Sequence, residues 1–538
     1  MIIVISSALF FLDCAMKEHI DLLIVHGKIY TVDEKNSQFD AMAIKDGKII
    51  ALGDSRSLQS KYMADSVIDL AGKPVFPGFI DAHCHFLGLA QNQQYIDLIG
   101  ARSFDEVLNR VKKGENRFSG GWLVGRGWDQ NLFPVKEFPN KSRLDLLFPD
   151  RPVLLIRIDG HSVLANEEAL KQAKIGLKNK FDPGEVDVKS GSLTGILCEK
   201  AADYMRNLVP LPDEETNRKF LAEAERICFA VGLCTVSDAG LDYNKIEWID
   251  SLQKKGLLKM RVYTMLNPTK ANLTNFLPRG PYITDRLFVR SIKLYADGSL
   301  GSRTALLKKP YQDDPSKMGI LVTPSDSVRR ICELAYKYGY QVNTHCIGDS
   351  AVRLILEIYG SVLKSKNDLR WRIEHAQVVD SSDLHYFSDF SVIPSVQATH
   401  ATSDMYWSEK RLGSKRITEA YAYKTLLNQN GWLPNGTDFP IEKVSPILTF
   451  YAAVARRDLN GHPKQGFQMG NALTREQALR SITIWAARSN FMENQSGSLE
   501  LGKNADFTIL DQDMMQIPIS RIPMVKVLHT FVNGEKVY

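Results

Sequence analysis

The chain has 538 residues, with 67 lysine and arginine side chains against 62 aspartate and glutamate side chains, so its formal net charge is +5, and 44% of its residues are hydrophobic. This composition is typical of a globular protein with a sizeable buried core, and it excludes disordered and fibrous architectures. Charges of both signs are interspersed without a lysine or arginine block, which argues against a nucleic-acid partner and favours a small-molecule partner.

The first residues are the candidate targeting segment. Residues 1–12 read MIIVISSALFFL, an apolar run that is too short to span a bilayer but long enough for the core of a signal peptide. Cys14 follows closely, as in a bacterial lipoprotein signal, although no lysine or arginine precedes the run. We expect residues 1–19 either to be a signal with a lipid anchor at Cys14, at the cell envelope, or to reflect a true start at Met16 in a cytoplasmic protein. No integral membrane span is expected.

Both ends of the chain show short alternating strands. The amino-terminal part contains three, LLIVHGKIYTV, AMAIKDGKIIAL and SVIDLAGKPVF, and the second includes a hairpin turn at Asp46-Gly47. The carboxyl-terminal part contains two more, at residues 506–511 and 525–532. We therefore predict that residues 20–74 and 491–538 complete one small β-sandwich.

Between the two ends, eight short apolar runs each end in polar or ionisable residues and precede a helix-like stretch. Eight parallel βα units predict a (β/α)₈ TIM barrel of the α/β class, whose functional groups sit at the carboxyl ends of the strands. We expect the first strand within residues 75–86 and the rest of the barrel within residues 218–490. The predicted strands are Val75–Ile80, Cys234–Ser237, Arg261–Leu266, Ser291–Tyr295, Gln341–Thr344, Arg370–Glu374, Ser391–Val396 and Gly431–Gly436.

Two parts of the predicted barrel depart from a simple repeat. The last strand is weakly supported, because Pro434 lacks the backbone donor that a central strand uses. Residues 87–217, between the first two strands, are far more than one helix needs, and they contain apolar runs of their own at Trp122–Val124 and Val153–Ile158. We predict that they form an inserted α/β subdomain over the barrel mouth.

Ligand-type residues end several of the predicted strands. His83 and His85 have i, i+2 spacing, which places both imidazoles on one face of an extended segment. Such a pair alone is weak evidence for a metal site, because its alternative is a pair of surface histidines. His345, His375 and Asp438 also lie at strand ends, however, and the strand ends of a barrel converge on one mouth. Four histidines and a carboxylate match the donors that zinc prefers, so we expect one or two divalent ions, with Zn²⁺ as the expected metal.

Lys293 needs a separate explanation, because it lies between apolar neighbours at the end of the fourth predicted strand. A buried ammonium is costly in such a place. Carboxylation of the Lys293 amine by CO2 would convert it into an anionic oxygen donor that can bridge two ions. The alternative is a salt bridge from Lys293 to Asp297 or Asp438.

Six segments together resemble the amidohydrolase superfamily and, within it, amidohydrolase family 3, a branch that includes N-substituted formamide deformylases. They are GKPVFPGFIDAHCHF, GWLVGRGWDQN, SIKLYADGSLGSRTALL, QVNTHCIGD, WRIEHAQ and NGTDFP. The resemblance covers roughly residue 21 to the carboxyl terminus and implies a metal-dependent hydrolase on a (β/α)₈ barrel with a sandwich from both chain ends. It also implies that one ion is shared by His83, His85, Lys293 and Asp438, and that a second is held by Lys293, His345 and His375.

The expected reaction is hydrolysis of a carbon–nitrogen bond outside ordinary peptides, in an amide, formamide or carbamate. The ions would lower the pKa of bound water from about 15.7 toward 7, giving hydroxide at neutral pH. Asp438 would take the proton from this water and pass it to the leaving group. An esterase or lactonase on the same site is the alternative reaction, and a catalytically idle sensor or regulatory protein is the alternative class. A homo-oligomer is compatible with these expectations.

Four further residues are candidates for substrate contact. Arg303 lies on a glycine-rich loop after the fourth predicted strand and could bind a carboxylate, or could pair with an aspartate such as Asp297 to hold the loop. His400 follows the seventh strand, where barrel loops are functional. His161 and Trp128 lie in the insertion and could form a lid, although a packed histidine and a core tryptophan are the commoner roles.

Overall fold

The structure is a computed structural model that describes residues 17–115, 121–158, 162–181, 185–210 and 212–538. The chain divides into two compact units, residues 1–86 with 225–538, and residues 87–224. The apolar run at residues 1–12, Cys14 and His161 lie outside the described residues. Among the helices of the described part, none is both long enough and apolar enough to cross a membrane.

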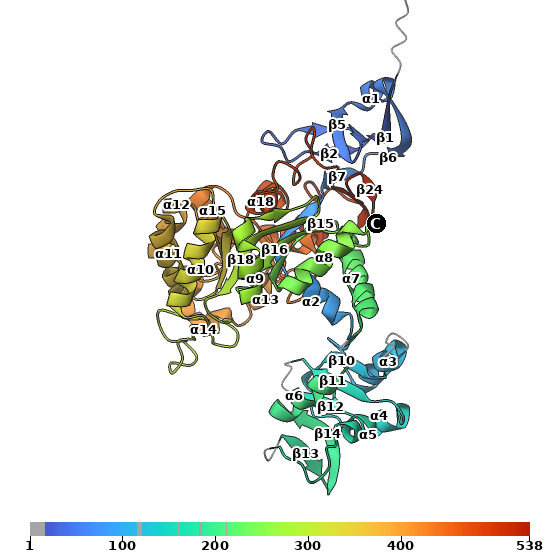
Figure 1. The fold of residues 1–538 in the computed structure, drawn as a ribbon, viewed down its shortest axis with the longest axis vertical. Coiled ribbons are helices and arrows are strands. Elements are labelled where there is room, and N and C mark those ends of the chain that lie inside the picture. The colour runs from blue at the N-terminus through green and yellow to red at the C-terminus, as the bar shows by residue number, and fades with distance from the viewer. Residues whose placement is uncertain (1–16, 116–120, 159–161, 182–184, 211) are drawn as a thin grey trace, which may run out of the picture. The chain divides into compact units, whose positions relative to one another are not determined.

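Seven parallel strands of the first unit form most of a barrel, in the order β21-β20-β19-β18-β16-β15-β8. Helices alternate with these strands along the chain and pack around them (Figure 1), which confirms the predicted βα barrel. Strand β16 is buried along its whole length, as expected in a parallel sheet that helices cover. The strands are β8 (Phe79–Cys84), β15 (Leu233–Leu241), β16 (Arg261–Leu266), β18 (Leu287–Tyr295), β19 (Gln341–Cys346), β20 (Arg372–His375) and β21 (Ile393–Ser395).

The chain from α7 to α18 supplies the helices that accompany these strands. A short strand, β17 (Tyr282–Ile283), pairs with β18 in the antiparallel direction. The helices are α7 (Glu214–Phe229), α8 (Tyr243–Lys254), α9 (Lys270–Asn275), α10 (Ser325–Tyr338), α11 (Asp349–Leu363), α12 (His385–Asp389), α13 (Ala398–Asp404), α14 (Ser408–Arg416), α15 (Tyr423–Asn430), α16 (Pro446–Ala455), α17 (Arg475–Ser481) and α18 (Ile484–Ser489).

An irregular segment takes the place of the eighth strand. The predicted strand Gly431–Gly436 is wrong as a regular strand, since these described residues form only an isolated parallel bridge between Asn435 and Val396. Pro434 contributes only its carbonyl, which accepts from Val396 N at 3.1 Å, in keeping with its missing donor. On the other side, Asp438 N donates to His83 O at 2.8 Å and His85 N donates to Phe439 O at 2.7 Å. These hydrogen bonds join the segment to both neighbouring strands.

The first predicted strand, Val75–Ile80, is also misplaced. The apolar run around it is two strands, β7 (Pro74–Pro77) in a smaller sheet and β8 in the barrel. The break falls at Gly78, where an added Cβ would lie 2.3 Å from Cys234 Sγ, so the backbone passes too close to the second barrel strand for any side chain. A continuous apolar pattern conceals this break, because both strands are buried.

The two chain ends meet in a small sandwich, as predicted. One sheet has the order β5-β4-β1-β6, and the other, β24-β23-β22-β7-β2-β3, combines strands from both ends of the chain (Figure 1). Positive φ angles at Asp46 and Gly47 form the predicted hairpin turn between β4 and β5. The elements are β1 (Glu18–Val25), β2 (Lys28–Tyr30), β3 (Gln38–Phe39), β4 (Ala41–Lys45), β5 (Lys48–Gly53), α1 (Ser55–Lys61), β6 (Tyr62–Asp69), β22 (Phe507–Leu510), β23 (Val527–Val532) and β24 (Glu535–Lys536).

The second unit is a mixed α/β structure with a six-stranded sheet in the order β13-β14-β12-β11-β10-β9. Its apolar residues form two clusters of buried side chains, so the unit has a core of its own. Helix α2 (Phe86–Asn92) leads into it from β8. Its elements are β9 (Ile96–Asp97), α3 (Phe104–Gly114), β10 (Leu123–Trp128), α4 (Ser142–Leu147), β11 (Val153–Arg157), β12 (Ser162–Ala165), α5 (Glu167–Gln172), β13 (Val186–Lys189), β14 (Ser192–Cys198) and α6 (Glu199–Leu208).

Candidate metal centre

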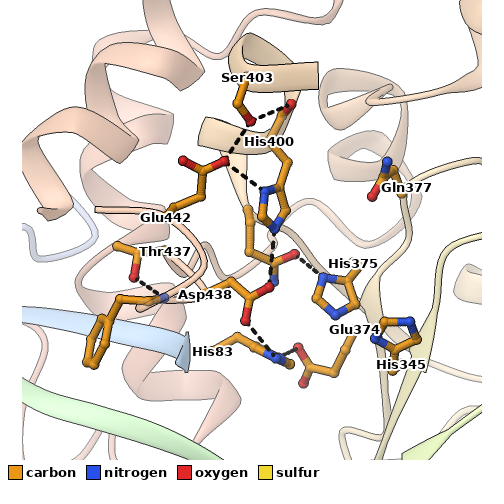
Figure 2. A network of polar contacts seen from close by, with 12 residues as sticks. His83, His345, Glu374, His375, Gln377, His400, Ser403, Thr437, Asp438 and Glu442 are labelled. Atoms are coloured by element: carbon orange, nitrogen blue, oxygen red, sulfur yellow. Dashed lines mark hydrogen bonds and ion pairs between the residues drawn. The ribbon is translucent and has the colours of Figure 1, made fainter. Parts of the chain in front are cut away.

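The six side chains predicted as ligands gather where the barrel strands end, and Figure 2 shows three of them, His83, His345 and His375, near Asp438. One ligand atom each from His83, His375 and Asp438 lies within 4.8 Å of the others. The remaining contacts are Lys293 Nζ to His83 Nε2 at 3.3 Å, His85 Nε2 to Asp438 Oδ1 at 3.2 Å, and 4.5 Å between the ring centroids of His345 and His375. The side chains that were predicted from the strand ends therefore lie close together in the structure.

Each of these four histidines has one ring nitrogen bonded to a protein oxygen outside the ligand set. This leaves the second nitrogen of each ring for the centre of the cluster. Histidines that bind metals characteristically have such an oxygen partner behind them, because it fixes the tautomer and the ring orientation. The pairs are His83 Nδ1 with Glu374 Oε2 at 2.7 Å, His85 Nδ1 with Ala239 O at 3.1 Å, His345 Nε2 with Gly298 O at 3.2 Å and His375 Nδ1 with Gln397 Oε1 at 2.6 Å.

Burial holds several of these groups in the uncharged form that binds metals. It lowers the pKa of His345 to about 3, and it lowers the pKa values of His83 and His375 as well, with nearby positive charge as a further cause. Burial also lowers the pKa of Lys293, whose side chain is almost completely inaccessible. Neutral imidazole is the form of histidine that coordinates metals, so the donor set fits a divalent ion.

Asp438 presents its two carboxylate oxygens to different partners. Oδ2 lies 3.3 Å from His400 Nε2, whereas Oδ1 faces His85 and, at 3.7 Å, His83 Nε2. Burial alone would raise the pKa of Asp438, but hydrogen bonds with His400 and His85 and the nearby histidines hold it well below its usual range. The residue also has a positive φ of 61°, as does His375 with 73°. Such backbone conformations are costly for residues other than glycine and are concentrated at functional sites.

Glu374 is a functional candidate that the sequence analysis missed. Its carboxylate is fully buried, accepts the hydrogen bond from His83 and lies 3.7 Å from the Arg372 guanidinium. Burial opposes ionisation, yet His83, Arg372 and Lys293 together lower the pKa of Glu374 to about 2. The carboxylate is therefore an anion behind a candidate ligand. Its signal in the sequence was a pair of charged residues, Arg372 and Glu374, on the two sides of Ile373 in a predicted barrel strand.

Asp81 is a second residue that was missed, and it fixes the geometry between β8 and the irregular closing segment. Its carboxylate accepts hydrogen bonds from Thr437 Oγ1 at 2.7 Å, Thr437 N and His83 N. Gly436 is required beside it, because an added Cβ would lie 2.5 Å from His83 N. Burial raises the pKa of Asp81 to about 7 against the effect of these hydrogen bonds. Asp81 thus holds His83 and Asp438 in register.

Tyr295 is a third missed residue, two positions after Lys293 on the same face of β18. The Lys293 Nζ lies 5.0 Å from the centroid of its ring, and the ring lies 5.8 Å from that of His345. About a third of the side chain is exposed, so the ring forms an accessible wall beside the candidate ligands.

The residues that were predicted to contact the substrate have different surroundings in the structure. His400 lies in the site, where it faces Asp438 and Glu442. Arg303 is engaged by Asp313 through Nε at 3.1 Å and Nη2 at 2.9 Å, which is the loop-holding role with a different aspartate from the one suggested. Trp128 lies in the core of the second unit and donates from its indole to Leu155 O, which corresponds to the packing alternative.

The alternative explanation of Lys293 as a salt-bridge partner has no support in the described part of the chain. No ion pair joins its Nζ to Asp297 or Asp438 there, and the polar atom at hydrogen-bond distance is His83 Nε2. The carboxylate of Asp297 instead accepts hydrogen bonds from the backbone of Ile347, Gly348 and Leu306.

Comparisons with known proteins identify related sequences and structures. A family model described as "Amidohydrolase family" matches residues 66–538. The protein YtcJ of Bacillus subtilis (strain 168), which carries an amidohydrolase name, is 32% identical over 95% of this chain and 98% of its own. The N-substituted formamide deformylase of Arthrobacter pascens is 25% identical over 96% and 97%. The crystal structure of an uncharacterized metal-dependent hydrolase from Pyrococcus horikoshii is 31% identical, with a TM-score of 0.77 over 93% of this chain and 99% of that one.

Proposed function

The chain belongs to the amidohydrolase family of metal-dependent hydrolases, and on that premise we propose that it cleaves a carbon–nitrogen bond of a small molecule, in an amide, formamide or carbamate outside ordinary peptides. The observation that carries the proposal is the cluster of four histidines, a lysine and an aspartate at the barrel mouth, with an oxygen partner behind each histidine. The similarity to an N-substituted formamide deformylase along nearly the whole chain supports the choice of bond.

The side chains divide into two sets that share Lys293. One set comprises His83, His85, Lys293 and Asp438, and the other Lys293, His345 and His375. Divalent ions held by these sets, with Zn²⁺ as the expected metal, would polarise a substrate carbonyl and lower the pKa of water toward neutrality.

Lys293 is proposed to be carboxylated on Nζ. Burial favours the neutral amine, which is the form whose lone pair can attack the carbon of CO2. The new N–C bond is accompanied by loss of one amine proton, so the product is an anion. An anion suits a position between two cations, where an ammonium would be repelled.

Asp438 is proposed to move the proton. Its Oδ1 faces the histidines, with His85 Nε2 at 3.2 Å, so this atom is placed to take a proton from the attacking water. The same oxygen then gives the proton to the leaving nitrogen as the carbon–nitrogen bond breaks. A positioned acid–base group of this kind contributes about 10²–10⁴-fold to the rate.

A substrate screen tests the proposal. Protein loaded with Zn²⁺ is incubated with N-substituted formamides, N-acyl amines and carbamates, together with matched esters and a dipeptide, and the released amine, alcohol or acid is quantified. We expect turnover of a non-peptide carbon–nitrogen bond, and loss of that turnover in His83→Ala and His345→Ala with the fold retained.

Other outcomes would contradict the proposal in distinct ways. Faster cleavage of the esters would make the protein an esterase, and cleavage of the dipeptide alone would make it a peptidase. Protein that is fully loaded with metal but turns over none of the substrates would be a catalytically inactive sensor or regulatory protein. Less than one equivalent of tightly bound divalent ion would refute the metal centre itself.

A further inference from the structure

A chain of polar contacts leads from Asp438 through His400 and Glu442 to Ser403 (Figure 2), which is exposed. His400 on α13 lies 3.3 Å from Asp438 Oδ2 through Nε2 and 3.1 Å from Glu442 Oε1 through Nδ1. Ser403, three residues later on the same helix, donates its hydroxyl to the same Glu442 oxygen at 2.6 Å. The side chains are 9% exposed at Asp438, 13% at His400 and 17% at Glu442, so the contacts lie largely out of solvent.

This arrangement makes the two oxygens of Asp438 unequal. A carboxylate can rotate about its side-chain bonds and offer either oxygen, unless one of them is held. His400 holds Oδ2, and this leaves Oδ1 directed at His85 and His83. The contact between His400, which is outside the ligand set, and Oδ2 therefore determines that Oδ1 is the oxygen that faces the proposed ions.

Glu442 in turn fixes the His400 ring. An imidazole bonded at one nitrogen can still pivot about that bond, whereas a ring bonded at both nitrogens has one orientation. Glu442 Oε1 is itself held by two donors on one face of α13, because His400 and Ser403 are separated by one helical turn. Hydrogen bonds of this kind behind metal-binding carboxylates and histidines commonly set the geometry of the metal.

We propose that His400 and Glu442 are positioning residues that orient Asp438, with Glu442 acting through His400. His400 thereby contacts Asp438 instead of serving as the substrate contact that its loop position suggested. The inference rests on the proposed function for its kinetic consequences, but the orientation of Asp438 can be measured independently of any substrate.

The first test uses Co²⁺, whose visible absorption bands depend on the geometry of its ligands. The full-length protein is loaded with Co²⁺, and metal content is measured for each variant. Glu442→Ala and His400→Ala should shift the bands at unchanged Co²⁺ content, because Asp438 is no longer held. Glu442→Gln should restore the wild-type spectrum, since the amide oxygen still accepts a hydrogen bond from His400.

Two controls separate positioning from general damage. Ser403→Ala removes one of the two hydrogen bonds to Glu442 and should shift the bands less than Glu442→Ala. Asp389→Ala breaks an exposed histidine–carboxylate pair, between His385 and Asp389 on α12, and should leave the spectrum unchanged. Should His400→Ala fail to fold, the Glu442 variants still decide the question, because that residue lies in a loop after Pro440. Spectra of Glu442→Ala that match the wild type would overturn the inference.

The second test measures kinetics with a substrate found in the screen. Glu442→Ala should lower kcat about 10–100-fold with a smaller effect on KM, and Glu442→Gln should recover most of the loss. An effect on KM alone would make these residues substrate contacts and overturn the inference, while the proposed function would stand. If the Co²⁺ bands shift in Glu442→Ala but the wild-type protein turns over no substrate, the proposed function would be overturned, while the inference would stand.

Discussion

Glu374 offers a direct test of how the site is supported, because it contacts a proposed ligand without being one. The substitution Glu374→Gln keeps the size of the side chain and an oxygen that can accept from His83 Nδ1, but removes the negative charge. A hydrogen bond to a charged group contributes about 1.5–3 kcal/mol. Changing the partner behind a metal-binding histidine costs about 10–100-fold in affinity, which is about 1.4–2.7 kcal/mol. The two figures agree, so the Kd for Zn²⁺ should rise about 10–100-fold.

The same substitution should also weaken the fold. The Arg372 guanidinium is fully buried, and its distance to the Glu374 carboxylate is 3.7 Å. Removing one member of a buried pair leaves the other charge uncompensated, which costs about 3–5 kcal/mol of the free energy of unfolding. Circular dichroism at the assay temperature must therefore show that the variant is folded before its affinity is interpreted.

The assay is a competition titration of metal-free protein against a chromophoric chelator of known zinc affinity. Glu357→Gln is the matched control, because Glu357 is a half-exposed glutamate on α11 that pairs with Arg353. Saturating Zn²⁺ should restore much of the turnover of Glu374→Gln, since every proposed ligand is still present. A folded variant with the zinc affinity of the wild type would refute the supporting role of Glu374.

Four further predictions follow from the site and its surroundings. Asp438→Asn should retain at least one ion by elemental analysis yet lower kcat about 10²-fold or more; a raised KM at unchanged kcat would make Asp438 a binding residue. Lys293→Ala should lose both bound metal ions, and added short carboxylic acids should restore some of its activity. In the wild type, ¹³C-bicarbonate should label Lys293; an unlabelled amine in active, fully metal-loaded protein would exclude the bridging role. Gly436→Ala should lower the melting temperature, because its Cβ would lie 2.5 Å from a backbone nitrogen, whereas Gly176→Ala, with no atom within 4 Å, should not. Hydrogen bonds from Lys308 and Ser382 lower the pKa of Asp380 to about 2, below the unfolded value of about 3.9, so its stabilisation is complete at neutral pH and disappears as the pH falls from about 4 to 2. Asp380→Asn should thus be less stable than the wild type in urea at neutral pH, and a deficit that did not shrink in acid would contradict this assignment.

The barrel and the proposed ligands could be predicted because their signals are local. A buried parallel strand is a short apolar run, and the residue that ends it is adjacent in the sequence, so His345 and His375 could be placed at strand ends directly. The run Arg261–Leu266 coincides with β16. Parallel strands in a barrel then bring these separate ends together without any knowledge of side-chain packing.

The supporting residues could not be predicted in the same way, since their roles depend on contacts between distant segments. Gln397 and Glu442 are ordinary polar residues in loops or at a helix end, and nothing nearby in the sequence pairs them with His375 or His400. The boundaries of the first predicted strand were wrong for a related reason. At Gly78 the chain leaves one buried sheet for another, and hydrophobicity does not change at such a crossing.

The closure of the barrel has a consequence for its opening motions. The hydrogen bonds from Asp438 N to His83 O and from His85 N to Phe439 O join the end of the first barrel strand to the irregular segment that takes the place of the eighth strand. Any fluctuation that parts them separates His83 from Asp438 at the same moment. An ion bound by both residues would resist this separation by a free energy that grows with its concentration relative to Kd. The deuterium exchange of these two amide protons should therefore slow as Zn²⁺ is added, far more than that of amides in the small sandwich.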